Sequence, residues 1–285
     1  MQIVEHLDPL RRAVDALRLA GPLALVPTMG ALHDGHLTLV RAARQQAAHV
    51  AVSIFVNPRQ FGAGEDLDAY PRPRERDLDL LRGEGVSLVW APVVEAMYPR
   101  GYATNVSVSG VSELLCGAAR PGHFDGVATV VCKLFNQVRP DIALFGEKDW
   151  QQLAVIRRMA RDLDLVQPHV DRILGVPTVR EADGLAMSSR NAYLSAEERT
   201  QAAALPRAMQ AAIAAVQSGE SIAPALATLA AKLLAAGFAA VDYAEIADAE
   251  SLQPLAVLGE SSARLLVAAR IGRARLIDNM AVGVV

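Results

Sequence analysis

Two histidines, His33 and His36, stand three residues apart around Gly35, and their type and spacing suit chemistry at a phosphate group. A neutral imidazole donates a hydrogen bond and a protonated one adds charge, so either form can stabilise negative charge that grows on a phosphate. Gly35 lets the backbone approach a ligand closely. Two other interpretations stay open: a turn histidine beside a helix-capping one, or a zinc pair. The zinc pair lacks a nearby cluster of cysteines or carboxylates to complete four ligands.

The residues around this pair predict a strand, a loop and a helix. The apolar run Leu23 to Val26 has the length of a buried parallel strand, and Pro27 and Gly30 then interrupt the chain. Helical spacing of apolar residues begins after Gly35, which places His36 at or just before a helix N-terminus. Free backbone N–H groups and the helix dipole favour an anion there. The pattern resembles the nucleotide site of the nucleotidyl-transferring α/β-phosphodiesterase superfamily.

The composition indicates a soluble, helix-rich chain with a substantial core. Its 285 residues are 52% hydrophobic but only 5% aromatic, and the formal net charge is −3. That balance argues against a dedicated nucleic-acid binder. The N-terminal residues lack the basic and apolar regions of a secretory signal, and no run is long enough to span a membrane. Cys116 and Cys132 give no disulfide framework. We therefore expect a cytoplasmic protein that works without a membrane.

Strand and helix patterns alternate through the first part of the chain. Apolar runs predict strands at 23–26, 50–56, 87–90, 104–108 and 142–145, and helical spacing predicts helices at 7–17, 74–84, 127–138 and 150–162 as well as the one after His36. Such alternation predicts βαβ units, hence a Rossmann-like α/β fold whose parallel sheet has helices on both faces. Ligands bind beyond the carboxyl ends of such strands. Three polar loops, 29–36, 57–60 and 146–149, follow strands there, and we expect them to converge on one site.

The chain changes character near residue 177. A turn-rich segment at 120–126 precedes that point, and residues 186–191 follow it with hydroxyl groups and Arg190 close together. Such a cluster suits triphosphate oxygens, although a serine-rich turn with a surface arginine would look the same. A capping-box pattern at 195–198 predicts a helix to 218. A second helix at 222–236 and strands at 241–246, 263–269 and 275–277 complete a smaller α+β domain. We expect domains at 1–177 and 178–285, the second covering the nucleotide site.

Seven segments together resemble the pantoate–β-alanine ligase family, nearly from end to end. They are PTMGALHDGH (27–36), SIFVNPRQF (53–61), DLDAYPR (66–72), RPGHFDGV (120–127), FGEKDWQQL (145–153), GVPTVREADGLAMSSRNAYL (175–194) and RLIDN (275–279). Two features depart from the family pattern: residues 165–174 are a few residues longer than usual, and Arg59 occupies a variable position.

The resemblance implies an AMP-forming ligase with small-molecule substrates. Pantoate would attack the α-phosphorus of ATP to give pantoyl adenylate and pyrophosphate, and β-alanine would then displace AMP to give pantothenate. Mg²⁺ would accompany ATP, held mostly by phosphates and water, and the chain would form a homodimer. Two rival functions stay open. Another H-x-G-H nucleotidyltransferase would keep the nucleotide on its product and release no AMP, and a nucleotide sensor would bind ATP without turnover.

The resemblance also implies roles for individual residues. The catalytic residues would be His36, His33, Lys148 and Arg190. The ATP-binding residues would be Met29, Gly30, Ala31, Leu32, His33, Asp34, Gly35, His36, Gly146, Glu147, Lys148, Asp149, Val179, Met187, Ser188, Ser189 and Arg190. Pantoate and β-alanine would contact Gln60, Gln152, Asn57, Tyr70, Arg120 and His123, and Asp77 would be a protein contact for Mg²⁺. Structural alternatives stay open: a surface ion pair for Lys148, loop packing for Tyr70 and His123, and a core position for Met187.

Overall fold

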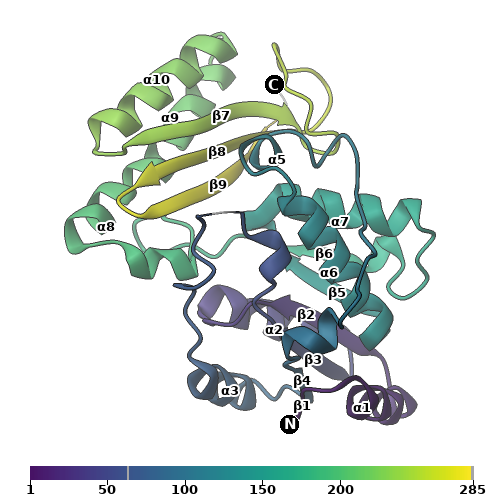
Figure 1. Cartoon of the computed structure of the whole chain (residues 1–285). Helices are drawn as coiled ribbons and strands as arrows, with labels where there is room; N and C mark the ends of the chain where they lie inside the picture. Colours follow the sequence, from purple (N-terminus) through teal and green to yellow (C-terminus); the bar gives the residue numbers. More distant parts are fainter. Residues whose placement is uncertain (63, 284–285) are drawn as a thin grey trace.

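Two separate sheets organise the chain in the computed structural model, which describes residues 1–62 and 64–283 (Figure 1). The first sheet has six strands in the order β1-β4-β3-β2-β5-β6, and every neighbouring pair is parallel. The second has three antiparallel strands in the order β7-β8-β9. The expected Rossmann-like α/β fold with a smaller α+β part is confirmed.

The strands of the large sheet are β1 (Gln2–Val4), β2 (Leu23–Thr28), β3 (His49–Ile54), β4 (Leu88–Trp90), β5 (Ile142–Gly146) and β6 (Ile173–Val176). The helices of this part are α1 (Leu7–Ala20), α2 (Asp34–Gln46), α3 (Arg74–Gly83), α4 (Val94–Met97), α5 (Cys116–Ala119), α6 (His123–Val138) and α7 (Trp150–Asp162). The short 3₁₀ turns are η1 (Pro58–Gln60), η2 (Glu147–Asp149) and η3 (Val170–Arg172). β2 lies between β3 and β5, so the chain builds the sheet outward from β2 in both directions. Such a position is a topological switch point, where folds of this kind bind ligands.

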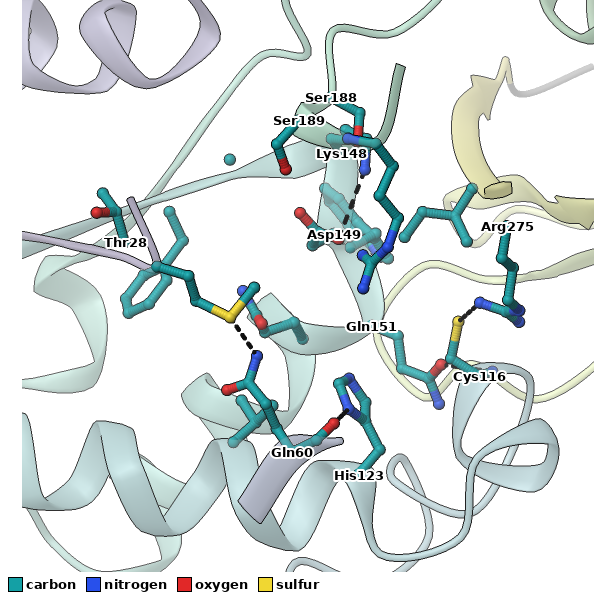
Figure 2. A pocket seen from close by; sticks show the side chains of 18 of the residues that line it. Thr28, Gln60, Cys116, His123, Lys148, Asp149, Gln151, Ser188, Ser189 and Arg275 are labelled. Atoms are coloured by element: carbon teal, nitrogen blue, oxygen red, sulfur yellow. Dashed lines mark hydrogen bonds and ion pairs between the residues drawn. The ribbon is translucent and has the colours of Figure 1, made fainter. Parts of the chain in front are cut away.

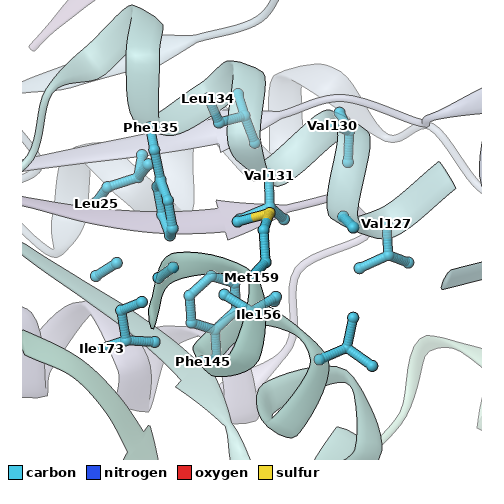
Figure 3. Packing of buried hydrophobic residues seen from close by; sticks show 14 of the residues in the cluster. Leu25, Val127, Val130, Val131, Leu134, Phe135, Phe145, Ile156, Met159 and Ile173 are labelled. Carbon is cyan, nitrogen blue, oxygen red and sulfur yellow. The ribbon is translucent and has the colours of Figure 1, made fainter. Parts of the chain in front are cut away.

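Alternating residues of the central strand β2 build cores on both faces of the large sheet. Leu23 and Leu25 pack in a cluster with residues of α1, α6 and α7, whereas Ala24 and Val26 pack in another with residues of α2 and α3. This is the period of two that a strand buried on both sides requires. In the first cluster the rings of Phe135 (α6) and Phe145 (β5) lie 6.3 Å apart in an edge-to-face arrangement (Figure 3).

The second part is a sheet covered by helices on one face only. Its elements are η4 (Ser189–Tyr193), α8 (Ala196–Ala202), α9 (Ala204–Gln217), α10 (Ile222–Ala235), β7 (Ala240–Asp248), β8 (Ala263–Ile271) and β9 (Ala274–Val282). Leu265 and Val267 of β8 join the core under these helices, whereas Leu266 belongs to the core of the large sheet. The uncovered face of the small sheet therefore turns toward the first part. No helix among the described residues is long and apolar enough to cross a membrane.

Three sequence-based predictions of local structure are wrong. Residues 104–108 form no strand, because side chains hold them: the Val106 N–H donates to the Thr129 hydroxyl at 2.9 Å. His123 is the first residue of α6 and does not lie in a preceding turn. The predicted helix from 196 to 218 is two helices that meet at Ala203. Pro206 explains the break, since proline lacks the N–H for the preceding turn and clashes with it.

The departure at residues 165–174 is accommodated between α7 and the last strand of the large sheet. The 3₁₀ turn η3 occupies Val170–Arg172, and β6 begins at once at Ile173. The His169 imidazole caps this turn by accepting from the Asp171 N–H. Residues 165–172 therefore stay outside the sheet, and the pairing of β6 with β5 from Ile173 onward is intact.

Close contact of α6 with η1 requires glycine at position 126. A Cβ there would lie 2.2 Å from the Arg59 carbonyl oxygen and 2.7 Å from the Gln60 nitrogen, both backbone atoms. We expect Gly126→Ala to lower the free energy of unfolding by about 1–3 kcal/mol. Urea unfolding measures this loss of stability.

Gly83→Ala at the end of α3 is the matched control for this substitution. A Cβ at Gly83 meets no described heavy atom within 4 Å, so the added methyl group should not lower the free energy of unfolding. A Gly126→Ala chain as stable as the unmodified one would contradict the close-contact argument.

Candidate active site

A cavity of about 680 Å³ lies beyond the carboxyl ends of the central strands and extends to the small sheet (Figure 2). Residues from the loops after β2, β3 and β5 all line it, as the sequence analysis predicts. Figure 2 shows Thr28 and Gln60 on one side and Cys116 and Arg275 on the other, with Lys148, Ser188 and Ser189 above. The site is thus a cleft between the two sheets.

Most of the candidate residues face this cavity. Those that line it are Met29, His33, Gly35, His36, Asn57, Gln60, Tyr70, Arg120, His123, Gly146, Lys148, Asp149, Gln152, Val179, Met187, Ser188, Ser189 and Arg190. Those absent from its lining are Gly30, Ala31, Leu32, Asp34, Asp77 and Glu147. The second group supports the loops from behind or, like Asp34, faces outward at the start of α2.

The two histidines form a capping box at the start of α2. His33 is the N-cap, and its Nδ1 accepts from the Gly35 N–H at 3.2 Å. His36 lies in the first turn of the helix, and its Nδ1 accepts from the His33 N–H at 3.4 Å. Because both Nδ1 atoms accept, the ring protons reside on the Nε2 atoms. Each ring is therefore a neutral donor, and both line the cavity.

Burial keeps both imidazoles neutral. Desolvation, helped by the nearby Lys148 ammonium, lowers the pKa of His33 to about 4. Desolvation, with the neighbouring His33 and Lys148, lowers the pKa of His36 to about 3. Near neutral pH both rings can therefore act only as hydrogen-bond donors, and the full positive charge beside them is that of Lys148.

The same pKa values predict a stability that falls in mild acid. Burial also lowers the pKa of His123 to about 4. Three histidines therefore stay unprotonated in the folded state at pH values below the ordinary histidine pKa. The unfolded chain binds protons below about pH 6.5 and the folded chain only near pH 4. The free energy of unfolding should be constant above about pH 6.5. Below it, each histidine should remove about 1.4 kcal/mol per pH unit down to about pH 4.

Urea unfolding at about pH 7, 6 and 5 measures this loss. The matched variant is His33→Asn, because asparagine is also a good N-cap but does not titrate. His33→Asn should reduce the slope of the free energy of unfolding against pH by the contribution of one histidine. A stability that stays constant between about pH 7 and pH 5 would contradict the burial of neutral imidazoles.

Lys148 reaches the cavity from the turn η2, which joins β5 to α7. Its side chain is 18% exposed, and its Nζ lies 3.8 Å from the nearest oxygen of Asp149. That distance is long for a hydrogen-bonded ion pair, so Asp149 leaves the ammonium able to bind other anions. Glu147 turns the other way, toward Arg264 at 3.6 Å. The surface ion pair that the sequence left open does not describe this lysine.

Arg190 bridges the two parts of the chain through a carboxylate that sequence reasoning missed. Its Nε and one terminal nitrogen donate to the two oxygens of Asp66 at 3.1 and 3.0 Å. The Tyr193 hydroxyl also donates to Asp66, and the Tyr70 hydroxyl contacts the Ser189 hydroxyl at 3.2 Å. The 66–72 motif therefore holds the 188–193 segment over the cavity. The 66–72 motif is one of the segments that carry the family resemblance, but the sequence alone does not show which residue pairs with Asp66.

Gln60 is the polar side chain that η1 presents to the cavity. Its Nε2 donates to the Met29 sulfur at 3.0 Å, and its Oε1 accepts from the Asn57 amide at 3.1 Å. Asn57 is 1% exposed and is also bonded to Gly126, Tyr98 and the backbone of Arg59. Asn57 thus positions Gln60 from beneath.

Arg120 and His123 support the same residue from the other side. The His123 Nδ1 donates to the Gln60 carbonyl oxygen at 2.7 Å, and its Nε2 accepts from Arg120 at 3.1 Å. The remaining Arg120 donors bind Glu65 and the Gln60 carbonyl. This pairing with Arg120 holds the pKa of the Glu65 carboxyl below its ordinary value. Arg120 and His123 both line the cavity, and both donate hydrogen bonds to the Gln60 carbonyl oxygen, which holds Gln60 in place.

The role of Arg59 is to hold η1 from outside. Its guanidinium lies 5.6 Å from the ring centres of both Tyr98 and Tyr102 and donates to Asn105 at 3.0 Å. Such cation–π contacts contribute about 0.5–1 kcal/mol each at exposed sites. Arg59 is absent from the cavity lining, so a variable residue at this position is compatible with a fixed Gln60.

The expectation that Asp77 contacts Mg²⁺ does not fit the structure. The carboxylate is 1% exposed, and its oxygens accept from the backbone N–H groups of Ala31 and Leu32 at 2.8 and 2.9 Å. Those bonds fold the 29–32 segment back beneath the histidines, where Gly30 adopts a φ of 82°. Asp77 is therefore a buried support of the loop. Among the described residues, His, Cys, Asp and Glu side chains form no group of three or more that could hold a metal ion.

Several lining residues come from the small sheet and were not proposed from the sequence. They are Tyr243, Leu266, Arg270, Arg273, Arg275, Ile277, Asp278 and Asn279. The RLIDN segment pointed to β9 but assigned no role to it. Distance along the chain concealed the link, because β9 lies more than eighty residues from η4 and more than a hundred residues from η2, the two turns that it contacts.

A parallel α/β sheet with an H-x-G-H capping box, a lysine and a serine–arginine segment around one cleft defines a nucleotide-dependent transferase or ligase. The family model described as pantoate–β-alanine ligase matches residues 2–281. This chain belongs to the pantoate–β-alanine ligase family.

Relatives support this membership at high identity. The chain is 69% identical to a pantothenate synthetase of Novosphingobium aromaticivorans over 99% of both chains, and 62% identical to one of Sphingopyxis alaskensis over 99% of this chain and 100% of that one. Among solved structures, a pantothenate synthetase of Thermus thermophilus has a TM-score of 0.92 at 50% identity, covering 99% of both chains. A Francisella tularensis ligase complexed with β,γ-ATP and β-alanine has a TM-score of 0.83 at 30% identity, covering 99% and 97%. The chain is thus a pantoate–β-alanine ligase.

Proposed function

We propose that this ligase works in two steps through pantoyl adenylate. In the first, a carboxylate oxygen of pantoate forms a bond to the α-phosphorus of ATP, and the bond from that phosphorus to the bridging oxygen breaks to release pyrophosphate. In the second, the β-alanine nitrogen bonds to the activated carbonyl carbon. The carbon–oxygen bond to AMP then breaks, and the nitrogen loses its proton. The adenylate is needed because a carboxylate itself is a poor acylating agent.

One observation carries this proposal: two neutral imidazole donors and a lysine ammonium converge on one cavity beside Gln60. The first step transfers negative charge to the α-phosphate and the departing pyrophosphate, and fixed donors in a partly buried site stabilise such charge strongly. His33 and His36 supply donors from the start of α2, and Lys148 supplies charge from η2. The protein thus contributes mainly position and electrostatics.

The remaining candidates divide the cavity between the two substrates. We propose that Val179 and Met187 flank the adenine; the Met187 N–H donates to the Val179 carbonyl at 2.9 Å, which holds the two residues together. Gly146 and Asp149 would meet the ribose. Ser188, Ser189 and Arg190 would face the phosphates. Gln60 and Gln152 would bind the hydroxyls and carboxylate of pantoate, with Tyr70, Arg120, His123 and Asn57 around them.

Mg²⁺ would arrive with ATP, held by phosphate oxygens and water, as magnesium in phosphoryl-transfer sites commonly is. The buried, fully bonded Asp77 carboxylate supports this division, since it leaves the metal to the substrate. We also propose a domain boundary between residues 177 and 178, because the last large-sheet strand ends at Val176 and the small sheet has its own core. A homodimer and a cytoplasmic location, where ATP is made and used, complete the proposal.

Oxygen labelling tests the adenylate directly. With pantoate labelled by ¹⁸O in its carboxylate and with β-alanine present, we expect one labelled oxygen in each AMP released. An acyl-phosphate route would instead place the label in inorganic phosphate and give ADP. A nucleotidylated product without AMP would favour the rival transferase, and binding of ATP without turnover would favour a sensor.

A further inference from the structure

Asn279 of β9 reaches across the cleft and binds the turn that carries Lys148. Its Nδ2 donates one hydrogen bond to the Glu147 carbonyl oxygen at 2.9 Å and one to the Lys148 carbonyl oxygen at 2.8 Å. Both protons of the amide are therefore used on consecutive peptide groups of η2. No other side chain of the small sheet is bonded to the backbone of this turn among the hydrogen bonds of the described residues. β9 and η2 are in direct contact, although they lie far apart in the sequence.

Asn279 is itself held on every side. It is 4% exposed, and its Oδ1 accepts from Arg264 at 2.6 Å. That arginine lies 3.5 Å from the ring centre of Trp150, the first residue of α7. The Asn279 N–H donates to Asp278, whose carboxylate pairs with Arg180 at 2.7 and 2.9 Å. A buried amide with all its hydrogen-bonding groups used is a rigid support.

We infer that Asn279 is a positioning residue for Lys148, through which the small sheet sets the place of the ammonium in the cavity. The inference rests on the role of Lys148 under the proposed function. A side chain with a flexible four-carbon stem amplifies any movement of its backbone, and Lys148 has only the distant Asp149 carboxylate as a partner of its own. The two hydrogen bonds from Asn279 fix that backbone. Because they come from the other part of the chain, the ammonium is placed correctly only when the small sheet is seated on the large one.

Asn279→Asp isolates this effect, because it keeps the size of the side chain and the acceptor for Arg264. It removes both donors and sets a carboxylate against two carbonyl oxygens. We expect kcat for pyrophosphate–ATP exchange to fall about 10–100-fold, as misplacement by about an ångström does, with KM for ATP changing far less. Met280→Ala is the matched control: it is the next residue on β9, and its side chain packs on the core of the small sheet. It should leave kcat near that of the unmodified chain.

A double-mutant cycle separates positioning from a general loss of structure. If Asn279 acts through Lys148, Asn279→Asp should have no further effect on exchange in a Lys148→Ala background. Equal factors in both backgrounds, or an equal loss in Met280→Ala, would overturn the inference. Full exchange activity in Lys148→Ala alone would instead refute the proposed role of the lysine.

Labelling of lysines gives a second readout that does not depend on turnover. The chain has three lysines, so Lys133 and Lys232 serve as internal standards for the rate at which an amine reagent modifies Lys148. Peptide mass spectrometry of the full chain should show a several-fold change in the Lys148 rate in Asn279→Asp and none in Met280→Ala. An unchanged Lys148 rate in Asn279→Asp would overturn the inference, whatever the result with Lys148→Ala.

Discussion

Replacing Lys148 by alanine is expected to lower kcat for adenylate formation about 10²–10³-fold while the chain folds normally. The ammonium is the positive charge that we place at the phosphates, and removing one preformed charge or donor from such a site costs about 3–4 kcal/mol of the barrier. The stability should change little, because the nearest carboxylate oxygen lies 3.8 Å from the ammonium, which is too far for a hydrogen-bonded ion pair. Pyrophosphate–ATP exchange measures the rate, and urea unfolding measures the stability.

Lys232→Ala is the control for the loss of a lysine. Lys232 is exposed on α10 and does not line the cavity, so its removal should leave exchange unchanged. Lys148→Ala with exchange close to that of the unmodified chain would remove this residue from the site.

His36→Gln is expected to slow adenylate formation about 10²-fold and to affect the second step much less. Glutamine is favoured at this capping-box position, so the start of α2 should stay intact while the imidazole Nε2 donor is lost. That donor acts on charge that develops during attack at the α-phosphorus. Supplying pantoyl adenylate with β-alanine bypasses this step, and amide formation should then fall less than about 10-fold.

The control for this substitution is His6→Gln. His6 precedes α1, makes no side-chain cap and is exposed, so both half-reactions should be unaffected. Equal losses in the two half-reactions for His36→Gln would contradict the assignment of His36 to adenylyl transfer.

The sequence predicted much of the large sheet because its strands carry their own signals. The sequence runs that form β2, β3 and β5 are apolar on both faces of the strand. Such runs indicate a sheet that helices cover on both sides. The helix Trp150–Asp162 was predicted with its bounds because Leu153, Ile156 and Met159 repeat at helical spacing. The strand expected at 104–108 is absent, and the Val106 N–H donates instead to the Thr129 hydroxyl, a partner that no local pattern reveals.

The sequence predicted only those features of the candidate site that local motifs determine. The position of His36 beside a helix start followed from the chain around it, but its neutral state follows from burial, which needs the tertiary structure. The family resemblance implied a metal contact for Asp77, whereas the backbone N–H groups that donate to its carboxylate come from residues 45 and 46 positions away. Asp66 and Asn279 were likewise concealed, because each acts on a partner more than a hundred residues distant.

The most direct test of the central claim is pyrophosphate–ATP exchange by the full chain with Mg²⁺, in the absence of β-alanine. Adenylate formation at the cleft of His33, His36 and Lys148 predicts exchange that requires pantoate and that falls about 10²–10³-fold in Lys148→Ala. Exchange that proceeds equally without pantoate, or no exchange from a folded chain that binds ATP and pantoate, would contradict the account.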